Sequence, residues 1–384
     1  MKHAAKPRVM VAYNRDFEGS EADPENKARE EVRCTADDVV AALAAGGIES
    51  GVVGVGDDLP AAMAQVTAFA PDVVFNLCES LGGDNSFEPL MPLLLEYAGI
   101  AYTGSPPLAL SLALHKHKAK DVLRAAGVPT PEGLAVASPA ELTSVRLPFP
   151  LIVKPAREDA SVGITSASVV HDRAGLKQQV TYVTARYRQP ALVERYIEGR
   201  EIYVAMLGRK DGGVDLLPLS EIDFTDMPAE RPRIVSFEGK WAESSAEFRG
   251  TKPVPCVGLT PEVQARIAEV ARTAFAAMEL RDYARLDLRL APDGTPYVID
   301  VNPNCDLSAA SGGFARAGRA AGIDYDELIR RIVDLALQRR PHADTIPLAV
   351  RSRAAGRNHL AGSGFPAAGD RDRDRAARRR ARSG

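Results

Sequence analysis

The sequence predicts an α/β protein of two or three packed units, with a parallel sheet first and mixed α and β structure after it. The chain has 384 residues, which is too long for one simple core. Residues 8–104 alternate between strand-type and helix-type segments. The later part contains strand pairs, and its strongest hairpin signal is Asp293-Gly294.

The N-terminal segments have the order βαβαβ. We expect strands at 8–13, 52–55 and 72–77, and helices at 25–45, 60–69 and 87–98. This order predicts a parallel sheet with helices on its faces. Ligands of such sheets bind beyond the carboxyl ends of the strands, where this chain has Asn14, Asn76 and Glu79. The first strand is not followed by GxGxxG, which argues against a dinucleotide domain.

The rest of the chain predicts two further units. The second begins near residue 115, with helices at 116–126 and 174–188 and strands at 150–155, 164–170 and 191–197. The third covers 201–339, with a strand at 201–207, a helix capped by Thr260, a strand pair at 284–301 and a helix at 324–338. The stretch 220–257 has no regular pattern, and such a length is typical of a functional loop or lid.

Composition narrows the class of protein. The chain is 45% hydrophobic and 26% charged, as in ordinary globular proteins, and no apolar run approaches the roughly 20 residues that span a bilayer. We therefore expect a cytoplasmic protein with no membrane partner. The four cysteines form no CxxC pair, so we expect free thiols rather than a zinc site or disulfides.

The C-terminal tail is basic. Residues 351–384 contain ten Arg and three Asp, while the whole chain has a net charge of −3. Such a tail can bind nucleic acid. Because it has almost no large apolar residues, we expect 346–384 to be a disordered basic extension, with no specific nucleic-acid partner.

The hairpin around Asp293-Gly294 carries the most informative polar pattern. If these two residues form the turn, Asp287 faces Asp300 and Arg285 faces Asn302, all on one side of the strand pair. The other side would then pack Leu286, Leu288 and Leu290 against Ile299 and Val301 in the core.

Facing carboxylates destabilise a hairpin unless something neutralises them. Carboxylate and amide oxygens suit Mg²⁺ bridging phosphates, and Arg285 beside them suits a developing negative charge. The alternative is a solvated polar face on which Arg285 and Arg289 neutralise the aspartates.

Other residues could bind a nucleotide. Lys154 ends an apolar strand before a loop that contains Ser161 and Gly163, where a lysine and loop amides could hold phosphates. Each remaining candidate has a structural alternative. Lys154 could be a surface lysine, Lys116 the basic start of a helix, Glu194 and Glu201 exposed strand-end carboxylates rather than adenine and ribose ligands, and Lys240-Trp241 a packing anchor rather than a lid.

These motifs together resemble the ATP-grasp superfamily and, within it, the D-alanine–D-alanine ligases. The resemblance covers about residues 8–338 and rests on an ordered series of segments. These are Val74-Phe75-Asn76-Leu77, Tyr102-Thr103-Gly104-Ser105, Gly127-Val128-Pro129-Thr130-Pro131, Ile152-Val153-Lys154-Pro155-Ala156-Arg157-Glu158, Ser161-Val162-Gly163, Arg285-Leu286-Asp287 and Asp300-Val301-Asn302-Pro303.

The resemblance implies a fold and a reaction. The fold is a Rossmann-like N-terminal sheet domain at 1–114, followed by an α+β ATP-grasp fold with subdomains at 115–198 and 199–345. The reaction is ATP- and Mg²⁺-dependent ligation of a carboxylate to an amine through an acyl phosphate. The substrates would be small amino acids or peptides, and a homodimer is an open alternative.

The resemblance also implies residue roles. ATP would contact Lys116, Lys154, the segment Glu194, Arg195, Tyr196 and Ile197, Glu201 and Lys240. Mg²⁺ would bind Asp287, Asp300 and Asn302, and catalysis would use Arg285 and Ser161. Glu31 would hold the ammonium group of the first substrate, and Ser311 lies where the carboxylate of the second, amine substrate would be held.

The chain departs from the family pattern mainly around the amine substrate. The family's histidine-glycine motif is replaced by Cys78-Glu79-Ser80, and the turn after Asn302 reads Pro303-Asn304-Cys305-Asp306. Alternatives to a D-alanine–D-alanine ligase-like enzyme are a ligase joining another amino acid to a secondary metabolite and a non-catalytic ATP-binding regulatory protein.

Overall fold

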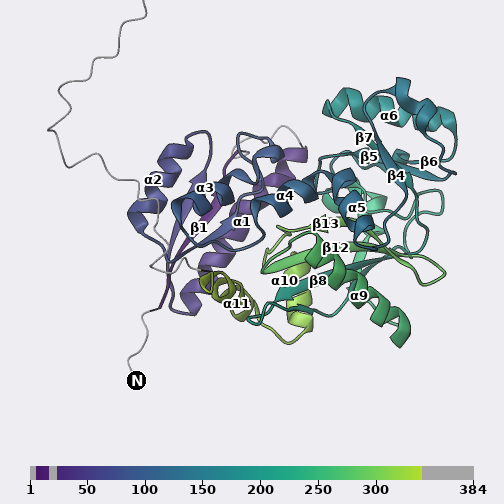
Figure 1. The fold of residues 1–384 in the computed structure, drawn as a ribbon. Helices are drawn as coiled ribbons and strands as arrows, with labels where there is room; N and C mark the ends of the chain where they lie inside the picture. The colour runs from purple at the N-terminus through teal and green to yellow at the C-terminus, as the bar shows by residue number, and fades with distance from the viewer. Residues whose placement is uncertain (1–5, 17–23, 340–384) are drawn as a thin grey trace, which may run out of the picture. The chain divides into compact units, whose positions relative to one another are not determined.

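The N-terminal residues form the expected parallel sheet. The structure is a computed structural model that describes residues 6–16 and 24–339, without the side chains of 24–31. The sheet has the order β2-β1-β3, and Figure 1 shows α1, α2 and α3 around it. Its elements are β1 (Arg8–Asn14), α1 (Pro24–Ala45), β2 (Glu49–Val55), α2 (Leu59–Phe69), β3 (Val73–Leu77), the short 3₁₀ helix η1 (Asn85–Phe87) and α3 (Leu90–Ala98). The order predicted from the sequence is confirmed.

Strand β1 is buried on both faces. Val9, Val11 and Tyr13 belong to one core cluster, and Met10 and Ala12 belong to another. A strand covered on both sides reads as a continuous apolar run, which is why Val9 to Tyr13 lacks a polar alternation.

A second sheet is antiparallel and has the order β4-β7-β5-β6. It consists of β4 (Gly133–Val136), β5 (Leu151–Pro155), β6 (Val169–Val170) and β7 (Ala191–Arg195), with α6 (Arg173–Tyr187) packed on it. The predicted strand at 164–170 is wrong except for β6. Thr165 and Ser168 bond each other's backbone amides and form a 3₁₀ turn, η3 (Ser166–Ser168), because their hydroxyls compete with strand pairing.

The third sheet has six strands, with the order β11-β10-β8-β12-β13 and β9 paired to β8. The strands are β8 (Arg200–Gly208), β9 (Val214–Leu216), β10 (Ser220–Asp223), β11 (Lys252–Pro255), β12 (Tyr283–Leu290) and β13 (Pro296–Asn302). Helix α9 (Pro261–Ala277) begins with the expected Thr260 cap. The prediction that 220–257 is irregular is wrong at both ends, where β10 and β11 pair with each other, and α7 (Phe237–Trp241) and α8 (Ala246–Arg249) lie between them.

The β12–β13 hairpin reaches the predicted pairing by another route. Its turn has three residues, because the Ala291 amide donates to the Thr295 carbonyl. A β-bulge next to Asp287 then restores the register, so that Asp287 faces Asp300 and Arg285 faces Asn302. The extra residue is Ile299. The expectation that Ile299 packs in the core is wrong, because Ile299 lines the pocket. Val298 is buried in the core instead.

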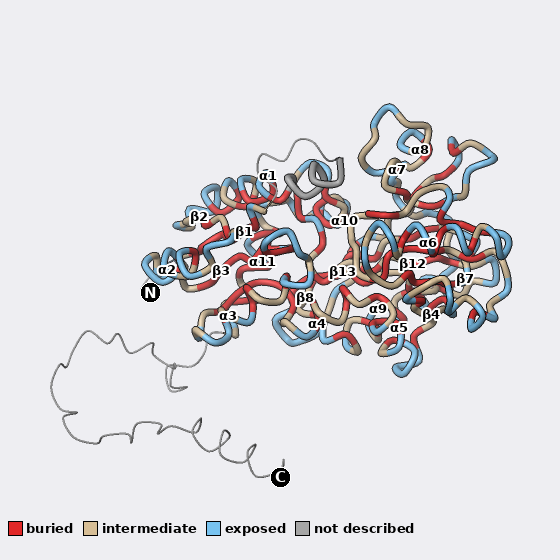
Figure 2. The backbone as a smooth tube through the Cα atoms, turned by 90° about the horizontal axis from the view of Figure 1, so that it is seen from above, coloured by how far each residue is buried: buried red, intermediate tan, exposed pale blue. Residues whose placement is uncertain are grey.

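Helices from the C-terminal part complete the N-terminal core. Helix α11 (Tyr325–Leu337) contributes Ile329, Ile332 and Val333 to the cluster that contains Val9 and Val11. Helix α10 (Gly313–Ala320) adds Phe314 to it. Figure 2 shows the buried segments of β1 and α11 near each other. The predicted segments 1–114, 115–198 and 199–345 thus share cores, and their status as separate domains stays a prediction.

Some expectations concern residues outside the described part of the chain. The predicted tail 346–384 is outside it. Among the described residues, no helix has the length and apolar character needed to cross a bilayer. The cytoplasmic location and the homodimer stay predictions.

Candidate active site

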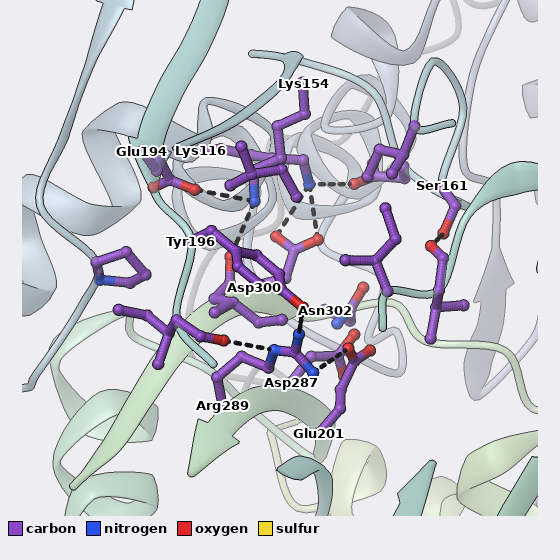
Figure 3. Close-up of a pocket in the computed structure, with 18 of the residues that line it drawn as sticks. Lys116, Lys154, Ser161, Glu194, Tyr196, Glu201, Asp287, Arg289, Asp300 and Asn302 are labelled. Carbon is purple, nitrogen blue, oxygen red and sulfur yellow. Dashed lines mark hydrogen bonds and ion pairs between the residues drawn. The ribbon is translucent and has the colours of Figure 1, made fainter. Parts of the chain in front are cut away.

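The residues expected to bind nucleotide and metal line one cavity. It lies between the second and third sheets, with β5 and β7 on one side and β8, β12 and β13 on the other, as Figure 3 shows for its labelled residues. Its lining contains Lys116, Lys154, Ser161, Glu194, Arg195, Tyr196, Ile197, Glu201, Lys240, Arg285, Asp287, Asp300 and Asn302. Residues far apart in sequence therefore converge on one site.

The polar face of the hairpin opens into this cavity. Arg285 donates from Nε and Nη2 to the two oxygens of Asp287, at 2.7 and 2.9 Å. Asp300 accepts from Lys116 Nζ at 2.9 Å through each oxygen, and Lys116 also pairs with Asp159 at 2.9 Å. Burial opposes ionisation of Lys116, but the two carboxylates raise its pKa above the usual value. This ammonium group is therefore charged at neutral pH.

Two more lysines surround the buried Glu194. Lys120 and Lys154 lie 2.5 and 3.2 Å from its carboxylate oxygens. Both also donate to the Ile299 carbonyl, at 3.0 and 3.4 Å, in the bulged part of β13. Burial lowers the pKa of Lys120 to about 8, although Glu194 acts in the opposite direction. The same two ammonium groups lower the pKa of Glu194 against the effect of its burial.

Arg289 organises the opposite end of the pocket. Its guanidinium donates to the carbonyls of Ile197 and Arg233, at 3.1 and 2.6 Å, and to the Tyr196 hydroxyl at 2.9 Å. It also pairs with Glu201 at 3.4 Å. Burial raises the pKa of Glu201, while Arg289 lowers it. This one arginine thus holds the chain segment that follows β7, the carboxylate on β8 and the loop before α7.

Two loops meet over the cavity. Ala160 and Ser161 both have a positive φ, of 52° and 63°, which costs backbone energy and is common at binding loops. The Ser161 hydroxyl donates to the Val235 carbonyl at 3.0 Å, and the Trp241 indole N–H donates to the Ala160 carbonyl at 3.2 Å. Lys240 lies over the Trp241 ring, 5.8 Å from its centroid. The segment 235–241 therefore packs against the loop at Ala160 and Ser161 beside the cavity.

A second, larger cavity adjoins the hairpin. Its volume is about 1080 Å³, and Asn14, Glu79, Glu88, Arg285 and Arg316 are among its lining residues. Ser311 also lines it, with its hydroxyl 2.8 Å from that of Ser308. Glu31 belongs to α1, but its side chain lies outside the described residues, so its role stays a prediction.

The structure excludes several of the purely structural roles considered for the candidate nucleotide-binding residues. Glu194 and Glu201 are 1% and 5% exposed, so they are not solvated strand-end carboxylates. Lys116 and Lys154 are buried too, which excludes surface lysines. Arg285 does neutralise Asp287, as the polar-face alternative holds, but Arg289 pairs with Glu201 instead, and Lys116 is the partner of Asp300.

The sequence analysis missed three contributors, Lys120, Asp159 and Ile299. Lys120 could have been found, because it follows Lys116 by one helical turn on α5 (Lys116–Ala125) and so shares its face. Ile299 could not have been found, because it depends on a bulge that compensates for the longer turn.

Lysines on β5 and at the start of α5 face carboxylates on the β12–β13 hairpin across one cavity, the arrangement expected of an ATP-grasp fold. The model of the family described as D-ala D-ala ligase C-terminus matches residues 125–334. The chain belongs to the D-alanine–D-alanine ligase family of ATP-grasp ligases, enzymes that form carbon–nitrogen bonds.

Individual relatives extend this assignment. A D-alanine–D-alanine ligase from Xanthomonas axonopodis is 31% identical over 306 residues, covering 78% of this chain and 88% of the relative. An uncharacterized protein, y4sG, from Sinorhizobium fredii is 37% identical over 267 residues, covering 70% of this chain and 75% of its own. The crystal structure of D-alanine–D-alanine ligase from Bacillus anthracis complexed with ATP has the same fold, with a TM-score of 0.66, 23% identity and coverage of 88% of this chain and 99% of that one.

Proposed function

We propose that this enzyme binds ATP and Mg²⁺ in the hairpin cavity and joins an amino acid or peptide carboxylate to an amine through an acyl phosphate. The observation that carries the proposal is the single polar face with Arg285, Asp287, Asp300 and Asn302, which opens into a cavity containing Lys116. A D-alanine–D-alanine ligase-like activity is the leading form of this function.

The donor set fits Mg²⁺. Among the described residues, no three His, Cys, Asp or Glu side chains are grouped as a metal site of their own. Two carboxylates and the amide of Asn302 are a partial set, and Mg²⁺ typically combines one or two carboxylates with substrate phosphates. Asn302 donates its Nδ2 to the Arg285 carbonyl at 3.3 Å, which leaves its Oδ1 as an acceptor. Asp287, Asp300 and Asn302 would hold the ion, which would neutralise phosphate charge.

The protein groups supply positioning and charge. A substrate carboxylate oxygen attacks the γ-phosphorus, the bond to ADP breaks, and an acyl phosphate forms. Lys116 and Lys154 neutralise phosphate oxygens during this step. The amine nitrogen then attacks the acyl carbon, loses a proton and expels phosphate. Arg285 stays cationic, since Asp287 raises its pKa against the effect of burial, and it stabilises the negative oxygens of the tetrahedral intermediate.

The cover formed by residues 235–241 would keep water from the acyl phosphate. Its hydrogen bonds to the loop at Ala160 and Ser161 support this role. Ser161 would then position the cover through the Val235 carbonyl and present its loop to the phosphates.

A second candidate is a ligase that joins an amino acid to a larger compound. The observation in its favour is the cavity of about 1080 Å³, slightly above the ~300–1,000 Å³ of pockets that hold drug-sized ligands. A non-catalytic nucleotide-binding protein would have no use for Arg285, which lies between the two cavities.

ADP release from ATP tests the function. We would supply D- and L-amino acids singly and in pairs with Mg²⁺, and expect ADP release that depends on an amine. Asp300→Ala should reduce Mg²⁺-dependent release at least about 1000-fold, whereas Asp121→Ala on the exposed face of α5 should retain it. Absence of release with every pair would remove the ligase proposal. Full activity of Asp300→Ala would place the metal elsewhere.

A further inference from the structure

Arg316 is a cation on the wall of the larger cavity that the proposed reaction does not use. It lies on α10, and its Nη1 donates to the Ser311 carbonyl at 3.2 Å. Its Nε is buried without a hydrogen-bond partner, and no carboxylate within the described residues forms an ion pair with it. Arg316 is half-buried, so part of its guanidinium keeps water, but the buried Nε has lost hydration without gaining a hydrogen-bond partner.

The surroundings of Arg316 are also cationic. A Cβ placed on Gly313 would lie 3.5 Å from Arg316 Nη2 and 3.7 Å from Arg285 Nη1, so both guanidinium groups converge beside this glycine. Burial lowers the pKa of Arg316, and Arg285 and Arg319 lower it further, while Tyr203 and Asp306 oppose them. Since Arg285 is already bonded to Asp287, the positive charge in excess at this point belongs to Arg316.

The proposed reaction leaves Arg316 without a role. Arg285 is expected to stabilise the reacting acyl group, and Ser311 is expected to hold the α-carboxylate of the amine substrate. The cavity beyond them extends far past the space that alanine needs, and it reaches Phe237, Trp241 and Phe248. An additional anionic group on the substrate would balance the positive charge of Arg316 on this side of the cavity.

We propose that the amine substrate carries a second carboxylate and that the guanidinium of Arg316 binds it. The substrate class is then a dicarboxylic amino acid, or a short peptide containing one. This inference rests on the proposed ligase function. Arg316 contacts the substrate away from the reacting atoms, so it determines which substrate binds and takes no part in the reaction steps.

The test compares acids with their amides. ADP release would be measured with aspartate against asparagine and glutamate against glutamine, in both D- and L-forms, as the amine substrate. We expect kcat/KM to be about 10- to 100-fold higher for one acid than for its amide, the contribution of a charged hydrogen bond. In Arg316→Met the acid-to-amide ratio should fall to near one, mainly through KM of the acid. Arg319→Met, on the exposed side of the same helix, should keep the ratio.

Three results would overturn the inference and leave the ligase function standing. One is equal use of acid and amide by the unmodified enzyme. Another is an equal loss for both in Arg316→Met, which would mean that Arg316 serves the phosphate common to all substrates. The third is equal affinity for acid and amide in calorimetric titrations of the full chain with ATP and Mg²⁺, a measurement that reports on Arg316 even without turnover.

Discussion

At the residue scale, the site depends on buried charges that balance one another. Lys120, Lys154 and Glu194 are all less than 10% exposed, and each lies within hydrogen-bond reach of another member of the group or of the Ile299 carbonyl. Such a group gains little stability over an apolar core, but the loss of one member leaves an uncompensated charge. We therefore expect the main effect of this group to be fixing side chains around the proposed nucleotide site.

Lys120→Met tests this balance. Removing the closer partner of Glu194 should lower the free energy of unfolding by about 3 kcal/mol and weaken ATP binding, since Glu194 and Lys154 lose their alignment. Denaturant unfolding and nucleotide titration would measure the two effects. Lys118→Met is the matched control, because Lys118 is exposed on the same helix and its change should stay within about 0.5 kcal/mol. If Lys120→Met left the free energy of unfolding and the ATP affinity unchanged, water would be compensating the charges that remain.

We expect the stability of the protein to depend on pH through the buried carboxyl group of Glu88. Burial raises the pKa of its carboxyl well above the usual value, and Asp159 and Glu79 raise it further. The folded state therefore holds this proton to a higher pH than the unfolded state, so the contribution of Glu88 falls as pH rises from its unfolded pKa of about 4.5.

Glu88→Gln removes this titration while keeping an acceptor for Asn304, whose Nδ2 lies 3.3 Å from Glu88 Oε1. The variant should match the unmodified protein in stability near pH 4 and exceed it increasingly toward pH 7 and above. Chemical denaturation across that range would show it. Parallel stability curves would contradict the assigned pKa direction.

At the element scale, two connections decide the geometry of the site. The bulge in β13 places Asp300 opposite Asp287 despite a three-residue turn, and it frees the Ile299 carbonyl for two lysines. The segment after β7 turns at Gly199, whose φ is +136° and whose carbonyl accepts from Arg289 at 3.3 Å. A side chain there has no room, because its Cβ would lie 2.0 Å from the Leu290 carbonyl oxygen.

Gly199→Ala should therefore destabilise the protein by more than about 2 kcal/mol and lower ATP affinity, as the backbone must move away from Arg289. Thermal unfolding and nucleotide titration are the measurements. Gly56→Ala, where no atom lies within 4 Å of the added Cβ, should leave both unchanged. A tolerated Gly199→Ala would show that the strand end is adaptable.

At the scale of the whole molecule, the first and last parts of the sequence share one core. Ile329, Ile332 and Val333 of α11 are buried together with Val9 and Val11 of β1. Arg339 adds a polar link, since its guanidinium donates to both oxygens of Asp282, at 2.5 and 2.6 Å, and to the Tyr102 carbonyl at 3.0 Å.

The fragment 1–114 alone should consequently fail to fold cooperatively. Without α10 and α11, one face of its sheet would expose a core that the intact chain buries. Circular dichroism on urea titration should show no sharp transition for the fragment and a sharp one for the full chain. A sharp unfolding transition of the fragment would establish 1–114 as an autonomous domain.

Local sequence patterns were sufficient to predict many of the secondary-structure elements of this protein. The βαβαβ order and the Thr260 cap followed from periodicity and capping chemistry, because these depend on neighbours in sequence. The facing of Asp287 with Asp300 was predicted from a two-residue turn, but it depends on the bulge that offsets a three-residue turn. The residues chosen by type and position as nucleotide and metal candidates line one cavity, while their roles stay predictions, and the order of the motifs identified the ligase family.

Only the tertiary structure decided what each charge faces. Arg289 binds Glu201 rather than the aspartates, Lys120 joins the site, and Ile299 turns from core to pocket, since these outcomes depend on sheet packing and a bulge. The segment 164–168 and the ends of 220–257 were misassigned for the same reason: their hydrogen-bond partners are distant in sequence or compete with strand pairing. The buried, unpartnered Nε of Arg316 is likewise visible only once the chain is folded around its cavity.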